Sequence, residues 1–202
     1  MKKNQVIELY NERIKKYGNK AKAVGWKNEK TQFLRFRDLL EDVKIEKNST
    51  VLDLGCGYGA LLDFFKMSQL NFEEKNYVGI DFSEKMIAEA STRFPQANFL
   101  CSDFFDMSLD NYDFIVCSGA LNIKIEKQDL YENLEKFLKK FLPLAKLALS
   151  FNLIHDMVDF KERGLNYYDL SKVVKLLSFF SRTFNVKNSS KLFESSITIF
   201  KK

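Results

Sequence analysis

The chain has 202 residues, of which 46% are hydrophobic and 29% charged, and its formal net charge is +5. This length suits one domain with a sizeable core, and the composition excludes an intrinsically disordered chain and a membrane-embedded one. The basic surplus lies in residues 1–50, which carry 10 Lys and 3 Arg against 7 acidic residues. The remainder is close to neutral, so the charge argues only weakly for a nucleic-acid partner.

Three cysteines, Cys56, Cys101 and Cys117, occur without a CxxC pair. This pattern argues against a disulfide framework and against a zinc site, so we predict no metal. We interpret Cys101 and Cys117 as buried strand residues and Cys56 as a small loop residue. The first ten residues lack the apolar segment of a signal peptide, and no apolar stretch is long enough to cross a bilayer. We therefore expect a cytoplasmic protein without membrane contact.

Residues 1–48 form an N-terminal extension with two predicted helices, over residues 4–17 and 31–43, and a loop over residues 18–28. Apolar residues in both helices recur at the spacing of an amphipathic helix. The extension also holds more aromatic and polar side chains than a plain covering helix needs, among them Tyr17, Trp26, Gln32 and Arg35. It is a candidate lid over a binding site, and the alternative is a helix packed on the sheet edge.

From residue 50 onward, short apolar runs alternate with helical patterns. Strands are predicted over residues 50–54, 77–80, 97–101, 114–117 and 144–154, and helices over residues 60–70, 84–90, 130–142 and 170–180. Ser83 and Asp169 have side chains suited to N-caps, and Pro143 ends the third of these helices. Because each strand is apolar on both faces, we expect a mostly parallel sheet covered by helices on both sides.

The last two apolar runs, residues 184–187 and 195–200, are joined by a short link around residues 189–192. A parallel crossover needs a longer connection, so these two strands should pair antiparallel. The expected fold is an α/β doubly wound, seven-stranded, mostly parallel sheet with one antiparallel strand near the C-terminus. Residues 49–202 would form this domain behind the extension.

The segment VLDLGCGYGALL (51–62) places a glycine loop between a buried strand and a helix. Glycines let a ligand approach the backbone closely, and a helix start offers free N–H groups, as in nucleotide-binding folds. Asp53 precedes Gly55 by two residues, where its carboxylate would repel a phosphate and attract an ammonium group. Asp81 ends the second strand, where it can accept hydrogen bonds from two ribose hydroxyls. These residues favour a nucleoside that carries a cationic amino acid over a dinucleotide.

Four segments in order resemble the class I S-adenosylmethionine-dependent methyltransferases: VLDLGCGYG (51–59), VGIDFSEKMIAEA (78–90), FLCSDFF (99–105) and YDFIVCSGALN (112–122). The resemblance extends over roughly residues 50–200. It implies the Rossmann-like methyltransferase fold and S-adenosyl-L-methionine as the cofactor. It also implies that the site lies where the parallel strands end.

The resemblance further implies three groups of cofactor-binding residues. The methionine part would be held by Asp53 and the loop residues Gly55, Cys56, Gly57 and Gly59. The adenosine part would be held by Asp81 at the ribose and by Phe82, Met86, Ser102, Asp103 and Phe104 around the adenine. Ser118 and Gly119, after the fourth strand, would face the methionine and methyl end.

Methyl transfer from a sulfonium is an in-line displacement, so the protein mainly aligns donor and acceptor and excludes water. A general base is needed only when the acceptor must lose a proton. His155 is the only histidine and follows the fifth strand, which makes it the candidate base, with a structural role as the alternative. The segment SGALN (118–122) lacks the Asn/Asp-Pro-Pro-Tyr/Phe motif found there in amino-methyltransferases, which disfavours methylation of a planar base amine.

Substrate selection is expected from the extension and from residues 155–168. Tyr167 and Tyr168 are candidate acceptor-pocket residues, with one of them expected in the core. Arg35 or Gln32 would reach the carboxylate of the cofactor or an acidic substrate. We predict methyl transfer to O or N of a small-molecule acceptor, with an acidic one favoured.

Two alternatives stay open at this point. One is RNA or protein methylation guided by the basic extension. The other is a non-catalytic module that binds the cofactor without turnover. A dinucleotide-dependent reductase is disfavoured by Asp53, and neither the acceptor nor the oligomeric state follows from the sequence.

Overall fold

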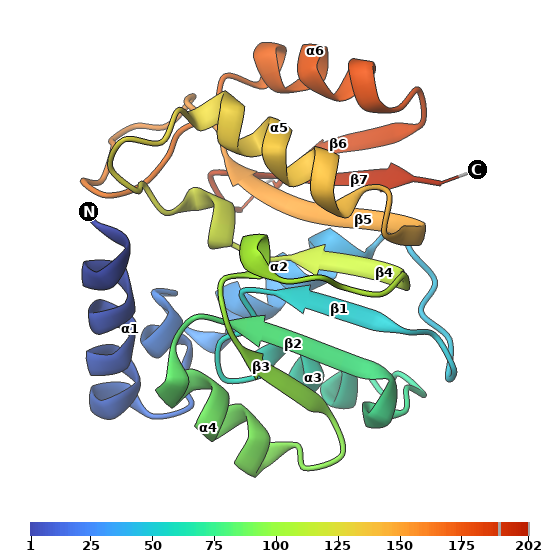
Figure 1. The fold of residues 1–202 in the computed structure, drawn as a ribbon. Coiled ribbons are helices and arrows are strands. Elements are labelled where there is room, and N and C mark those ends of the chain that lie inside the picture. Colours follow the sequence, from blue (N-terminus) through green and yellow to red (C-terminus); the bar gives the residue numbers. More distant parts are fainter. Residues whose placement is uncertain (190, 202) are drawn as a thin grey trace.

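The computed structural model describes residues 1–189 and 191–201. A seven-stranded sheet runs through the molecule in the order β3-β2-β1-β4-β5-β7-β6 (Figure 1). Its strands are β1 Val51–Leu54, β2 Tyr77–Asp81, β3 Asn98–Cys101, β4 Tyr112–Cys117, β5 Ala145–Ile154, β6 Phe184–Asn188 and β7 Glu194–Phe200. Strand β7 is antiparallel to both β5 and β6, and the other pairs are parallel. The predicted doubly wound sheet with one antiparallel strand is confirmed.

Helices precede the sheet and connect its strands. They are α1 Lys3–Tyr17, α2 Glu29–Leu40, α3 Ala60–Met67, α4 Glu84–Arg93, α5 Leu130–Phe141 and α6 Leu170–Phe180, with short 3-10 helices η1 Ala21–Val24, η2 Glu74–Asn76, η3 Phe104–Asp106 and η4 Ala120–Asn122. The predicted N-caps are confirmed: the Ser83 hydroxyl accepts from the Met86 N–H, and the Asp169 carboxylate accepts from the N–H groups of Ser171 and Lys172. In the part of the chain that the structure describes, no helix is both long and apolar enough to cross a bilayer.

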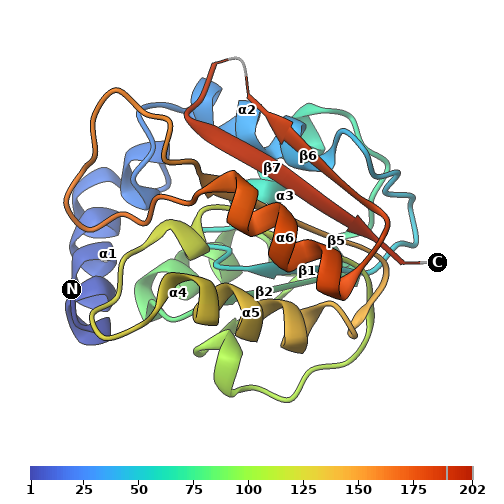
Figure 2. The same cartoon turned by 90° about the horizontal axis from the view of Figure 1, so that it is seen from above.

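Successive side chains of the central strands enter opposite hydrophobic layers, as the two-residue period of a strand requires. Leu52 and Leu54 pack in one layer with Phe137 of α5, whereas Val51 packs in the other with Leu61 of α3. Figure 2 shows α5 and α6 on one side of the sheet and α2 and α3 on the other. Helices therefore cover both faces.

The two edge strands correct the prediction that every strand is apolar on both faces. β3 is exposed at Asn98 and Cys101, and β6 is exposed at Asn185 and Asn188. An edge strand lacks a neighbour on one side, so less of its surface is covered. Cys101 is therefore exposed and not buried as predicted.

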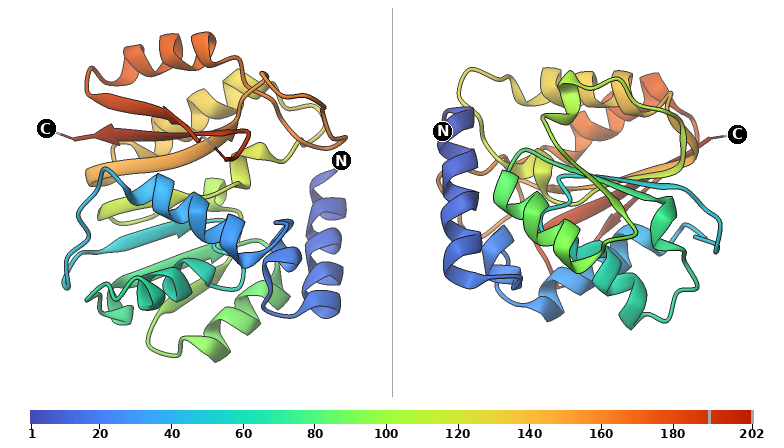
Figure 3. Two further views of the ribbon diagram at one scale, coloured as in Figure 1. Left: turned by 180° about the vertical axis from the view of Figure 1, so that it is seen from behind. Right: turned by 60° about the horizontal axis from the view of Figure 1, so that its bottom comes forward.

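In the N-terminal segment, helix α1 lies across the edge of the sheet at which the parallel strands end, whereas α2 packs on one face of the sheet (Figures 1 and 3). The predicted loop between these two helices is only partly irregular, because it contains η1, whose Ala21 and Ala23 are buried. A four-residue 3-10 turn is too short to leave a helical period in the sequence. The buried residues of this segment, such as Ile14 and Leu39, share a hydrophobic cluster with α3 and β1.

Candidate functional site

A cavity of about 230 Å³ lies at the carboxyl ends of β1, β2, β4 and β5. Doubly wound sheets bind ligands at this edge. Nine lining residues come from the N-terminal segment: Met1, Leu9, Tyr10, Arg13, Val24, Gly25, Trp26, Gln32 and Phe36. The remaining wall is built from the glycine loop, from the residues after β2, β4 and β5, and from residues 162–165. The chain thus encloses a site that the sheet alone would leave open.

The glycine loop after β1 forms one wall of the cavity. Gly57 has a φ of +54°, and a Cβ at this position would lie 2.9 Å from Cγ1 of Val24. Its N–H donates to Oδ2 of Asp81 at 3.0 Å. Glycine is required here because the backbone is left-handed and the covering segment packs directly against it.

Asp53 contributes a buried carboxyl group to the same wall. The side chain is 3% exposed and lines the cavity, and its Oδ2 accepts a hydrogen bond from the Tyr77 hydroxyl at 2.5 Å. Burial raises the pKa of Asp53 to about 7, the Tyr77 hydrogen bond opposes this rise, and the charge of Asp81 adds to it. A cationic group in the cavity would favour the ionised form of Asp53.

Asp81 is oriented by two backbone N–H groups. Its Oδ2 accepts from Gly57, and its Oδ1 accepts from Ser83 at 2.9 Å. Burial raises the pKa of Asp81 to about 6, and these backbone hydrogen bonds oppose the rise. Each carboxylate oxygen has a second lone pair, so Asp81 can still accept from hydroxyl groups of a ligand.

The apolar end of the cavity lies beside β2 and η3. Phe82, Met86 and Phe104 line it, and Tyr10 of α1 packs edge-to-face on Phe82 with ring centroids 6.2 Å apart. This end can accept a flat aromatic group. Ser102 and Asp103, predicted at the same place, are outside the lining; Asp103 forms an ion pair with Lys3 at 2.5 Å.

The opposite end of the cavity is formed by residues that follow β4. Ser118 and Gly119, which the family resemblance predicts at the methyl end of the cofactor, both line the cavity here. The N–H of Gly119 donates to Oδ1 of Asn152 at 2.7 Å. Gly119 has a φ of +84°, and a Cβ there would lie 2.8 Å from Cζ2 of Trp26. The tryptophan of the N-terminal segment therefore sits directly over this glycine.

Arg35 does not line the cavity, in contrast to the hypothesis that it reaches a ligand carboxylate. Its Nε donates to Oε1 of Glu194 at 2.8 Å, and its guanidinium carbon lies 3.8 Å from the centre of the Trp26 ring. Gln32 does line the cavity, and its Oε1 accepts from the Tyr58 hydroxyl at 2.9 Å. The arginine that lines the cavity from α1 is Arg13.

Several other predicted site residues lie outside the cavity lining. Tyr168 is fully buried and donates to the carbonyl of Leu121 at 2.8 Å, so it is the core member of the tyrosine pair. The Tyr167 hydroxyl accepts from the N–H of Glu162 at 2.6 Å. Tyr17, Gly59 and His155 also lie outside the lining. Tyr17 packs against the hydrophobic cluster of α2 and α3, and Gly59 contacts the ring of Phe94. His155 is 8% exposed and forms a backbone bridge with Tyr168.

Sequence reasoning missed three cavity residues that matter chemically: Arg13, Asn122 and Arg163. In the sequence, Arg13 has the pattern of an ordinary basic residue on an amphipathic helix, and Arg163 that of a charged residue in a loop. Asn122 ends the segment SGALN, in which the family resemblance predicts site roles for Ser118 and Gly119 only. No pattern in the sequence signals that these three side chains line one cavity, because that depends on tertiary structure.

The chain matches the family described as "Methyltransferase domain" over residues 45–159. It is 31% identical over 115 residues to a provisionally named methyltransferase of Mycobacterium tuberculosis, covering 54% of this chain and 66% of that protein. It is 30% identical over 158 residues to a protein-lysine N-methyltransferase of Saccharomyces cerevisiae, covering 66% of this chain and 68% of that protein.

Solved structures share the fold over the full chain. One is the magnesium protoporphyrin IX methyltransferase of Synechocystis, solved with bound SAH (S-adenosylhomocysteine). It superposes on this chain with a TM-score of 0.70 at 17% sequence identity, and the match covers 99% of this chain and 100% of that one. By contrast, the chain spans 45% to 66% of the length of the first curated relatives it matches.

Proposed function

Because the chain belongs to the class I S-adenosylmethionine-dependent methyltransferases, we propose that it transfers a methyl group to an oxygen or nitrogen atom of a small-molecule acceptor. The observation that carries this proposal is the enclosure of the cavity by residues 1–36. An acceptor must fit beneath Tyr10 and Trp26 to reach the residues after β4. This arrangement favours a small molecule over a folded macromolecule.

The residues of the cavity fit the cofactor of this family. We propose that Asp53 receives its ammonium group, Asp81 its ribose hydroxyls, and Phe82 with Met86 its adenine. Arg13, and not Arg35, is our candidate for its carboxylate, because Arg35 is already paired with Glu194. When bound, the cofactor supplies an electrophilic methyl group on a sulfonium. Gly57 and Gly119 leave the space that this fit needs, since a Cβ at either would meet the covering segment.

The protein's own contribution, in this proposal, is alignment and exclusion of water. Trp26 and Tyr10 cover the cavity, and Asn152 fixes the backbone of Gly119 at the methyl end. We assign no proton transfer to His155, because its side chain is outside the cavity lining. An acceptor that needs no deprotonation by the protein fits this arrangement.

We keep residues 1–48 as a distinct extension and propose that part of it is a lid. Lys3 forms an ion pair with Asp103, and the side-chain oxygen of Asn11 accepts a hydrogen bond from the Ser83 hydroxyl at 2.7 Å. The carbonyl of Met1 accepts from the N–H of Glu126 at 3.0 Å. These polar contacts cross from α1 to the rim of the cavity. Polar rim contacts can break and re-form as a ligand enters, whereas the apolar contacts of α2 persist.

A second candidate is methylation of a protein lysine, which the yeast relative favours because that protein is a protein-lysine N-methyltransferase. Under this alternative the lysine side chain would enter past the rim formed by residues 162–165. RNA methylation is a third possibility suggested only by the basic N-terminal quarter.

The test combines cofactor binding with analysis of the methylated product. Calorimetry with S-adenosylhomocysteine and with NAD should show binding of the first alone; binding of NAD alone contradicts the family-based proposal. Incubation with radiolabelled S-adenosylmethionine and a cell extract should then place the label in the small-molecule fraction. Label confined to protein or RNA would replace this proposal by the corresponding alternative, and SAH binding without label in any fraction would favour a non-catalytic module.

A further inference from the structure

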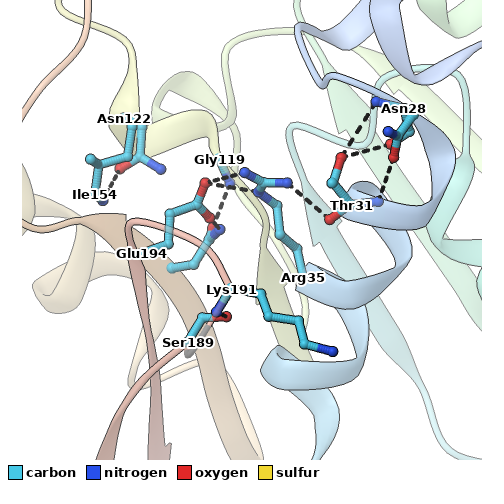
Figure 4. Close-up of polar contacts among 10 residues, drawn as sticks. Asn28, Thr31, Arg35, Gly119, Asn122, Ile154, Ser189, Lys191 and Glu194 are labelled. Carbon is cyan, nitrogen blue, oxygen red and sulfur yellow. Dashed lines mark hydrogen bonds and ion pairs between the residues drawn. The ribbon is translucent and has the colours of Figure 1, made fainter. Parts of the chain in front are cut away.

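Asn122 carries a buried hydrogen-bond donor without a partner. The residue is 1% exposed and lines the cavity, and its Nδ2 makes no hydrogen bond to any described residue. Its Oδ1 accepts from the N–H of Ile154 at 2.9 Å. Because that partner is a donor, the atom facing Ile154 must be the oxygen, which fixes the other atom as the NH₂ group. Figure 4 shows the amide nitrogen on the side away from Ile154.

A buried amide N–H without a partner costs about 1–3 kcal/mol, so proteins rarely leave one without a reason. Ser118 is in the same condition: its Oγ is buried, unpartnered and on the same stretch after β4. Both side chains line the same cavity. Two orphaned polar groups on one wall indicate a ligand with an oxygen that accepts hydrogen bonds.

The position of Asn122 assigns this oxygen to the acceptor and not to the cofactor. Along the sheet edge, Asp81 ends β2, Asp53 lies in β1, Ser118 follows β4, and Asn122 bonds to the end of β5. The cofactor's ammonium and ribose are proposed to lie at the first two positions. The space beside β4 and β5 is therefore left for the methyl acceptor.

The polar groups around this space favour an anion because the buried donor of Asn122 and the hydroxyl of Ser118 have no partner among the described residues. Arg13 is the candidate for the cofactor's carboxylate, so the charged side chains of the lining that are left for the acceptor are Glu162 and Arg163, one of each sign. Glu162 and Arg163 are both exposed at the rim.

An ammonium acceptor would meet the donor groups of Asn122 and Arg163, which is unfavourable. The buried carboxylates nearest to β4 and β5 have other partners: Asp53 the proposed ammonium group of the cofactor, and Glu194 the guanidinium of Arg35.

We propose that Asn122 and Ser118 bind a carboxylate oxygen of the acceptor, which makes this protein a carboxyl O-methyltransferase of small organic acids. The inference rests on the proposed function. In the step, a C–O bond forms as the methyl C–S bond breaks, and the electron pair of that bond stays on sulfur as a neutral thioether. A carboxylate is already deprotonated at neutral pH, so no proton leaves the acceptor and no general base is needed.

The test uses pairs of acids and amines of matched size with radiolabelled S-adenosylmethionine: propionate with propylamine, hexanoate with hexylamine, and benzoate with benzylamine. We expect label in acids only, as an ester that alkali hydrolyses. Asn122→Asp keeps the acceptor for the Ile154 N–H but replaces the free NH₂ by an anionic oxygen. It should lower ester formation at least tenfold while SAH affinity, measured by calorimetry, is retained.

Asn111→Asp is the matched control, because it makes the same charge change at an exposed loop residue outside the cavity lining. Label in the amines, label in none of the acids, or an unchanged rate for Asn122→Asp would each overturn the carboxylate proposal. In all three results the retained SAH binding leaves the methyltransferase assignment intact. If the unmodified protein does not bind SAH, that separate result contradicts the proposed function.

Discussion

Arg35 and Glu194, 159 positions apart in the chain, form a buried ion pair in which Nη2 lies 2.7 Å from Oε1 (Figure 4). The other carboxylate oxygen of Glu194 accepts from Nδ2 of Asn152, whose Oδ1 holds the N–H of Gly119. The guanidinium of Arg35 also stacks on Trp26. One ion pair therefore connects Trp26 of the N-terminal segment with the backbone of Gly119 on the opposite wall of the cavity.

Glu194→Ala should lower the free energy of unfolding by about 3 kcal/mol, because it leaves the guanidinium of Arg35 buried without its partner. Urea denaturation followed by circular dichroism measures the change. Glu46→Ala is the control, since the Lys44–Glu46 pair is exposed and should leave the midpoint unchanged. Equal midpoints for Glu194→Ala and the unmodified protein would show that the buried pair adds nothing to stability.

Gly119→Ala should disturb Trp26, the only tryptophan of the chain, because the added Cβ would lie 2.8 Å from the indole ring. We expect a shift of the tryptophan emission maximum and at least tenfold weaker SAH binding. Gly18→Ala is the matched control: its φ is also positive (+58°), but a Cβ there meets nothing within 4 Å. It should cost about 1–3 kcal/mol of stability through backbone strain alone, because Gly18 also has a ψ of −152°, and the emission should be unchanged. Identical emission spectra for both variants would contradict the contact.

Cofactor affinity should depend on pH through Asp53. Its pKa is raised to about 7 in the ligand-free protein, and an ammonium group binds the ionised carboxylate. Binding therefore releases a proton below pH 7, and affinity should be about tenfold weaker at pH 6 than at pH 8. Calorimetry in two buffers of different ionisation enthalpy measures the proton release. Asp53→Asn should reduce this release to the smaller contribution of Asp81, whose pKa is raised to about 6.

The free energy of unfolding of the ligand-free protein should decrease as the pH rises, whereas the cofactor affinity should increase. The folded chain binds the proton of Asp53 more tightly than the unfolded chain does, since the pKa is raised from 3.8 to about 7 by burial. Stability should therefore fall as pH rises through this window. Thermal melts between pH 4.5 and pH 7.5 measure it, with Asp53→Asn as the reference that removes this contribution. A difference between the two proteins that stays constant over this range would argue against the raised pKa.

Asp81→Asn should weaken SAH binding by roughly ten- to a hundredfold. An amide has one oxygen where the carboxylate accepts from both Gly57 and Ser83, so one N–H of the loop loses its partner. The loss of a charge-assisted hydrogen bond is worth about 1.5–3 kcal/mol. Asp63→Asn serves as the control, because Asp63 pairs with Arg93 outside the cavity lining. Quenching of Trp26 emission on titration with SAH gives both affinities.

The proposed lid predicts that SAH slows trypsin cleavage at Lys20, Lys22 and Lys27, which are exposed between α1 and α2. Lys75 in η2 is outside the cavity lining and should be cleaved at the same rate with and without SAH. Deletion of residues 1–30 should weaken SAH binding at least tenfold, with circular dichroism to confirm that the sheet is retained. A folded deletion variant that binds SAH as tightly as the full chain would exclude the lid.

The alternation of strands and helices could be predicted from the sequence, because the apolar residues of each helix recur at a fixed local spacing. The central strands could be predicted because they are short apolar runs, buried on both faces. The glycine loop could also be predicted, since left-handed backbone demands glycine at fixed positions. Exposure at the sheet edges could not be predicted. Cys101 has the same kind of apolar neighbours as Cys117, and only the strand order makes the first an edge residue and the second a central one.

The sequence by itself determined the family, the cofactor and the sheet with its antiparallel strand, because these depend on short segments and on the lengths of their connections. The tertiary structure alone decided which polar side chains enter the cavity. Arg35 is turned away by Glu194, Arg13 enters from α1, and Asn122 presents a free amide. Such contacts join residues far apart in the chain, so their partners, and with them the class of acceptor we propose, follow from packing and not from local pattern.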